Sequence, residues 1–141
     1  MVYRLCQHFL SQYLVYTKTT MTKIAIIEDD QAILQMYRIK FETEGFTVET
    51  AENGLLGLEL LEKFKPDVVL MDLMMPNMNG DELLAEIRKT EWGRDMKVII
   101  LTNMGEQEAP DTLKDLDVSA FIVKANMTPR QVADLVNKQL S

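Results

Sequence analysis

Short apolar runs alternate with amphipathic stretches along most of the chain, and each apolar run is a predicted β-strand. The five predicted strands are Thr22–Ile27, Phe46–Thr50, Val68–Met71, Lys97–Leu101 and Ala120–Val123. Several of these runs are apolar throughout, so we expect both faces of the sheet to be covered by other elements. The second run alternates weakly between apolar and polar residues, which is typical of an edge strand.

A predicted helix follows each strand, because apolar residues there recur every three or four positions. The helices are expected at Asp30–Gly45, with Asp30 as cap and Gly45 as stop, at Asn53–Phe64, Asn79–Lys89 and Glu106–Leu116, and from Thr128 and Pro129 to Leu140. The fourth is the weakest, because Pro110 lacks an N–H donor and clashes with the preceding turn unless a helix starts there. This regular alternation predicts βαβ units with right-handed crossovers and a parallel sheet.

Composition narrows the class of protein. A chain of 141 residues suits one domain with a substantial core. The single cysteine, Cys6, excludes an internal disulfide and a cysteine-rich metal site. The net charge of −7 disfavours direct binding to the phosphate backbone of nucleic acids. No apolar stretch reaches the roughly 18 residues that a membrane span requires.

The first twenty residues differ from the rest, since they contain Arg4 and Lys18 but no acidic residue. They lack the unbroken apolar region and cleavage site of a secretory signal. We interpret residues 1–20 as an N-terminal extension upstream of a start at Met21, and residues 21–141 as the single domain. A short amphipathic helix within the extension is the alternative.

Four of the predicted strands end abruptly on a chemically reactive group. These groups are Glu28 with Asp29, Asp72, Thr102 and Lys124. In an open parallel sheet the carboxyl ends of the strands line one crevice, where ligands bind. Each residue alone has a plainer explanation as a helix cap, a turn residue or a solvated side chain. Their convergence on one sheet edge instead favours a site for a divalent cation and a phosphoryl group.

The order and spacing of these groups resemble the receiver domains of two-component response regulators, over residues 21–141. The resemblance is carried by Glu28 and Asp29, the turn from Asp72 through Pro76 to Gly80, Thr102, and Phe121 three residues before Lys124. It implies a flavodoxin-like, doubly wound parallel sheet of five strands in the order 2-1-3-4-5, with helices on both faces. We expect a stand-alone receiver, since no further domain follows Leu140.

The resemblance also implies roles for the site residues. Asp72 is expected to accept a phosphoryl group from a phosphohistidine on a sensor histidine kinase or phosphotransfer protein. Glu28, Asp29, Asp72 and the backbone carbonyl of Met74 are the expected ligands of Mg²⁺. Thr102 and Lys124 are expected to contact the phosphoryl oxygens. The chain would then be a cytoplasmic phosphoacceptor with slow self-dephosphorylation and not an enzyme.

Output is expected through a downstream protein and not through direct contact with nucleic acid or a membrane. In the family, the residues corresponding to Thr102 and Phe121 act as a switch that alters the face made by the fourth helix, last strand and last helix. The alternative is a pseudo-receiver, a protein-interaction module that is not phosphorylated.

Departures from the family pattern lead to further expectations. Ala125 follows Lys124 where the family usually has proline, and a cis bond there would cost about 2.5–4 kcal/mol. We therefore expect a trans bond, and a Lys124 side chain that reaches the site only when the phosphoryl group is bound. Asp117 stands where glycine is common and is expected to be left-handed. Asn103, Met74 and Met104 should obstruct the approach of donors and water, which predicts a long-lived acyl phosphate.

Overall fold

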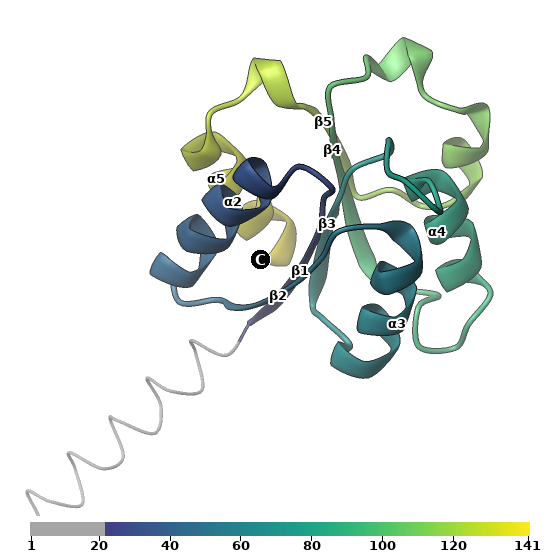
Figure 1. Ribbon diagram of the computed structural model, residues 1–141, viewed down its shortest axis with the longest axis horizontal. Coiled ribbons are helices and arrows are strands. Elements are labelled where there is room, and N and C mark those ends of the chain that lie inside the picture. The colour runs from purple at the N-terminus through teal and green to yellow at the C-terminus, as the bar shows by residue number, and fades with distance from the viewer. Residues whose placement is uncertain (1–21) are drawn as a thin grey trace, which may run out of the picture.

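The structure is a computed structural model that describes residues 22–141 (Figure 1). The expectations for residues 1–20, an upstream extension or a short amphipathic helix, lie outside the described residues. No helix within residues 22–141 has both the length and the apolar character needed to cross a membrane.

Five parallel strands form one sheet in the order β2-β1-β3-β4-β5, as the sequence predicted. The strands are β1 (Lys23–Ile27), β2 (Thr47–Ala51), β3 (Val68–Met71), β4 (Lys97–Thr102) and β5 (Ala120–Val123). The register pairs Ile27 with Met71, Met71 with Ile100 and Thr102 with Val123. The strands therefore end along a common edge, and the residues that follow them are brought together.

Four α-helices of the described chain cover the two faces of this sheet. They are α2 (Gln31–Thr43), α3 (Gly54–Phe64), α4 (Gly80–Arg88) and α5 (Pro129–Leu140). Helices α2 and α5 lie against one face, and α3 and α4 lie against the other (Figure 1). Each face has its own apolar core, in which Phe41 and Val136 contribute to the first and Leu61 and Leu83 to the second. The doubly wound architecture is thus confirmed.

Local sequence signals explain where several helices begin and end. The Asp30 side chain accepts hydrogen bonds from the backbone N–H groups of Ala32 and Ile33, so it caps α2 as predicted. Gly45, at φ 94°, adopts a left-handed conformation just past the end of α2. Thr128 and Gln131 form a reciprocal capping box at the start of α5.

The predicted α-helix at Glu106–Leu116 is wrong. Two short 3₁₀ helices replace it, η1 (Glu106–Glu108) and η2 (Asp111–Asp115). Pro110 separates them, because it lacks an N–H and disfavours the helical conformation of the residue before it. Ala109 is accordingly extended, at φ −65° and ψ 146°. The output face expected to include a fourth helix therefore has η1 and η2 in its place.

Candidate functional site

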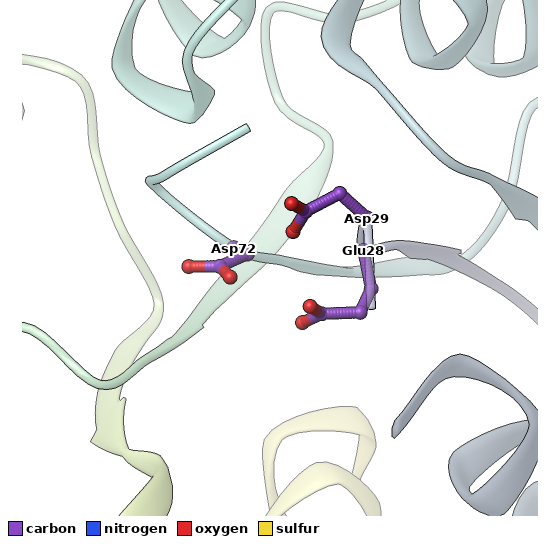
Figure 2. Close-up of side chains that lie close together, drawn as sticks. All are labelled: Glu28, Asp29 and Asp72. Carbon is purple, nitrogen blue, oxygen red and sulfur yellow. The ribbon is translucent and has the colours of Figure 1, made fainter. Parts of the chain in front are cut away.

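Three carboxylates meet where β1 and β3 end. Glu28 and Asp29 follow β1, Asp72 follows β3, and the Asp72 N–H donates to the Ile27 carbonyl at 3.0 Å. One carboxylate oxygen from each residue lies within 4.8 Å of the others, and Figure 2 shows the Glu28 and Asp29 side chains extending toward Asp72. Glu28 and Asp72 are buried, whereas Asp29 is exposed. The cluster is therefore reachable from solvent at Asp29.

Lys124 lies directly against the two buried carboxylates. Its Nζ is 2.6 Å from Glu28 Oε2 and 3.0 Å from Asp72 Oδ2. Every peptide bond within residues 22–141 is trans, which confirms that expectation for Lys124–Ala125. The expectation that Lys124 reaches the site only with a phosphoryl group bound is wrong. Two buried negative charges need a counter-charge, and the lysine supplies it in the unmodified protein.

The remaining carboxylate oxygens bond to nearby backbone groups. Glu28 Oε1 accepts from the Asp30 N–H at 3.1 Å, and Asp72 Oδ1 accepts from the Met74 N–H at 3.2 Å. These bonds orient both side chains toward the shared space. All three acids offer oxygen, the donor type that Mg²⁺ prefers, so the cluster fits a hard divalent cation.

Burial and charge shape the protonation of the ion-paired groups. Burial raises the pKa of Glu28, and the neighbouring Asp72 charge adds to this, while the bonds from Lys124 and the Asp30 N–H oppose it. Burial would lower the pKa of Lys124, but its bonds to Glu28 and Asp72 outweigh that effect and raise this pKa. The lysine is therefore held in its charged form, facing an excess of carboxylates.

Thr102 ends β4 at the same edge of the sheet and is 1% exposed. Its Oγ1 accepts from the Met104 N–H at 3.3 Å. A hydroxyl that accepts in one bond keeps its proton for another, so Thr102 can donate to an oxygen of a bound group.

The turn after Asp72 depends on Gly80. The Gly80 N–H donates to the Leu73 carbonyl at 2.9 Å. A Cβ atom added at Gly80 would overlap the carbonyl oxygen of Asp72. The glycine is thus required because the start of α4 passes directly against the backbone of the proposed acceptor.

A pocket of about 440 Å³ lies beside the acidic cluster. Its walls include Asp29, Met74, Met75, Met104 and Pro110. The Met74 side chain is 60% exposed, and Met104 is partly buried against the core. The two methionines that were expected to border the approach of water do line one pocket with Asp29.

The predicted switch residue Phe121 lies on β5, where it is half-buried and packs against the α3/α4 core. It borders a pocket of about 740 Å³ together with Pro110, Leu113 and Lys114. Asp117, just before this strand, is left-handed at φ 53°, as expected.

Sequence reasoning missed Arg88, at the end of α4. Its guanidinium donates to the carbonyl of Leu116 at 2.8 Å, of Asp117 at 2.9 Å and of Met96 at 2.7 Å. It also donates to Gly93 at 2.8 Å. Arg88 therefore holds the end of α4 against the loops that precede β4 and β5, at the edge of the sheet opposite the site.

Comparison with known proteins identifies the class. A family model described as the response regulator receiver domain matches residues 24–137. The chain is 37% identical over 101 residues to the transcriptional regulatory protein GlrR of Escherichia coli, covering 72% of this chain and 22% of GlrR. It is 33% identical over 100 residues to the DNA-binding dual master transcriptional regulator RpaA of Synechocystis, covering 71% of this chain and 41% of RpaA. The chain thus spans less than half the length of these relatives.

Solved structures agree with this match. Chemotaxis response regulator CheY4 of Vibrio cholerae superposes with a TM-score of 0.78 at 26% identity, covering 85% of this chain and 99% of CheY4. The receiver domain of sensor histidine kinase PA1611 from Pseudomonas aeruginosa shares the fold, with a TM-score of 0.76 at 20% identity, covering 84% of this chain and 97% of that one. This chain belongs to the response regulator receiver domain family.

Proposed function

We propose that Asp72 accepts a phosphoryl group from a phosphohistidine on a sensor histidine kinase or phosphotransfer protein. The observation that carries this proposal is the Asp72 carboxylate, which lies among Glu28 and Asp29 and 3.0 Å from Lys124 Nζ. A carboxylate oxygen of Asp72 forms a bond to phosphorus, the bond from phosphorus to the imidazole nitrogen breaks, and the imidazole leaves. The product is an acyl phosphate on the receiver.

Glu28, Asp29 and Asp72 would hold Mg²⁺ through their carboxylates, together with the backbone carbonyl of Met74. The bound ion would offset negative charge on the phosphoryl oxygens. The solved structure of the PA1611 receiver domain, which has a similar fold, contains a magnesium ion coordinated in its active-site cleft.

Two further side chains of this site would position the phosphoryl group. The Lys124 ammonium, already 3.0 Å from Asp72 Oδ2, would move onto a phosphoryl oxygen as Asp72 becomes modified. The Thr102 hydroxyl would donate to a second oxygen. Both contacts favour the modified state over the unmodified one and so bias the local conformation.

We infer that the signal leaves through a protein partner on the face formed by η2, β5 and α5. Phe121 borders the pocket on this face, and Thr102 lies on the neighbouring strand, so the two switch residues connect the site to it. The net charge of −7 disfavours direct contact with DNA, although relatives such as RpaA are DNA-binding regulators.

The test is intact-mass analysis after incubation with acetyl phosphate and Mg²⁺. The wild-type chain should gain one phosphoryl group, Asp72→Asn should gain none, and chelation of Mg²⁺ should prevent the gain. Asp111→Asn is the matched control, because Asp111 is an exposed acid outside the cluster. Labelling of Asp72→Asn on the same peptide would refute the acceptor assignment. Asn103 is expected to slow small donors, so the incubation is prolonged, and a wild-type chain that still gains no phosphoryl group would identify a pseudo-receiver.

A further inference from the structure

Within residues 22–141, one edge of the sheet has backbone groups that no other strand pairs with. Strand β2 pairs with β1 alone, and no described strand lies on its other side. The Thr47 N–H donates to Thr22 and the Ala51 carbonyl accepts from Glu28, so these alternate residues face β1. Successive residues of a strand direct their backbone groups to opposite sides. Val48 and Thr50 therefore direct their backbone N–H and C=O groups away from β1. An extended chain laid along this edge would find an unused hydrogen-bonding register.

A groove of about 490 Å³ lies at the C-terminal end of this edge, between α2 and α3. It is lined by Gln31, Leu34 and Gln35 of α2, Ala51 of β2, and Leu56 and Leu60 of α3. The volume lies within the range of about 300–1,000 Å³ typical of ligand sites. Leu56 is 45% exposed although it is a leucine, so part of the apolar wall is open to solvent. The wall formed by α2 presents side-chain amides instead.

The rim of the groove is acidic. Glu52 and Glu59 line it and are exposed. Glu52 accepts a hydrogen bond from Gln31 Nε2 at 3.0 Å, which holds it on the α2 side. Lys63 lies 3.3 Å from Glu59 and balances that charge only. Glu52 therefore leaves the α2 side of the groove with excess negative charge.

We propose that an extended segment of a partner protein, with alternating apolar and basic side chains, docks in this groove as an additional strand beside β2. Its backbone bonds to the outward groups of Val48 and Thr50. Its apolar side chains point toward α3 and cover Leu56, and its basic side chains point toward α2 and meet Glu52. A second copy of this chain fits less well, because it would bring like charges to the same seam. The docking does not depend on phosphorylation of Asp72.

The test uses a synthetic peptide in which Val alternates with Lys or Thr and both ends are capped. The peptide is titrated into the full chain, and the backbone amides of the protein are followed by NMR. We expect the largest shifts at the Val48 and Thr50 amides. Replacing the central residue of the peptide with proline, which removes a backbone donor, should abolish these shifts. Replacing lysine with glutamate should weaken binding by about tenfold or more.

A matched pair of variants locates the contact. Leu56→Lys removes apolar surface from the groove and adds a positive charge that repels the basic side chains of the peptide. It should therefore weaken peptide binding by about tenfold or more. Leu55→Lys, at an adjacent position that is 53% exposed and does not line the groove, should change the affinity by less than roughly twofold. Both positions are open to solvent, so both variants should fold. The proposal is overturned if Val48 and Thr50 do not shift at about 1 mM peptide, or if both variants bind equally.

Discussion

At the scale of single residues, Lys124 sets the electrostatic balance of the site. Its ammonium lies against Glu28 and Asp72, whose side chains are 4% and 8% exposed. Charges at such depth are weakly screened, and removing one partner leaves the other buried without compensation. The lysine thus has a structural role before any phosphoryl group arrives.

Replacing Lys124 with methionine should lower the free energy of unfolding by about 3 kcal/mol, because two buried carboxylates lose their counter-charge. Urea denaturation with Mg²⁺ chelated measures the effect. Lys114→Met is the control, since Lys114 forms an ion pair with Asp111 in which both side chains are at least 80% exposed. That pair should contribute less than about 1 kcal/mol. Equal losses in the two variants would contradict a structural role for Lys124.

The methionines beside the site lead to a prediction about the lifetime of the acyl phosphate. Hydrolysis needs a water aligned opposite the Asp72 oxygen, and Met74 and Met104 line the adjacent pocket. A thioether is a weak acceptor and orients water poorly. The Met74→Asn/Met104→Glu double variant should therefore lose its phosphoryl group about tenfold faster, which corresponds to ~1.4 kcal/mol in the barrier.

The decay rate of isolated phosphorylated protein measures this effect. Met36→Asn, on the exposed side of α2, should decay like the wild type. A double variant that decays no faster would show that these two positions do not control access of water.

At the scale of elements, the pattern of apolar residues predicted the strands well, because consecutive residues of the central strands are buried. The bounds of β3 and β5, Val68–Met71 and Ala120–Val123, are those predicted. The segment at Glu106–Leu116 was harder to predict, because helical spacing there competes with one proline that divides it. The strand-end rule correctly placed Glu28, Asp29 and Asp72 together. It could not reveal that Lys124 already contacts two of them, since that contact follows from burial.

Arg88 shows a second limit of sequence reasoning. Its acceptors are backbone carbonyls between 5 and 29 positions away, and every residue carries a carbonyl. No local pattern of side chains could therefore have identified this arginine as a clamp.

Arg88→Lys should lower the free energy of unfolding by about 2–3 kcal/mol, because a single ammonium group cannot donate to all the backbone carbonyls that the guanidinium reaches. The amide of Ser119, which donates to the Val98 carbonyl at 2.8 Å in the loop that Arg88 holds, should also exchange faster with solvent. Hydrogen exchange and urea denaturation measure the two effects. Lys89→Met, at the next position, removes only an exposed ion pair with Glu86 and should change stability by less than about 1 kcal/mol. An unchanged exchange rate of the Ser119 amide in Arg88→Lys would mean that Arg88 does not hold this loop.

At the scale of the whole molecule, the sheet connects the proposed acceptor to the proposed output face. Thr102 pairs with Val123 on β5, two residues beyond Phe121, and Phe121 borders the pocket beneath η2. A change at Thr102 thus has a short path to this face through neighbouring strands.

Addition of beryllofluoride and Mg²⁺, which mimic the acyl phosphate, should shift amides at Asp111–Leu116 and Phe121. The reason is the proposed switch, in which we expect the Thr102 hydroxyl and the Phe121 ring to change position together in the modified state. Two-dimensional NMR measures this, and Asp72→Asn should show none of these shifts. Shifts confined to α2 and α3 would place the output elsewhere.

The wide sequence separation of the site residues has a consequence for biosynthesis. Lys124 bonds to Glu28 and Asp72 across 96 and 52 positions of the chain. The ribosome therefore synthesises Glu28, Asp29 and Asp72 long before Lys124, whose ammonium pairs with Glu28 and Asp72. Contacts between residues so far apart in the sequence also form slowly. A nascent receiver that lacks β5 carries mutually repelling acids and no finished acceptor site. Competence to receive a phosphoryl group should thus appear only after the last strand has joined the sheet, which would keep a kinase from modifying unfinished chains.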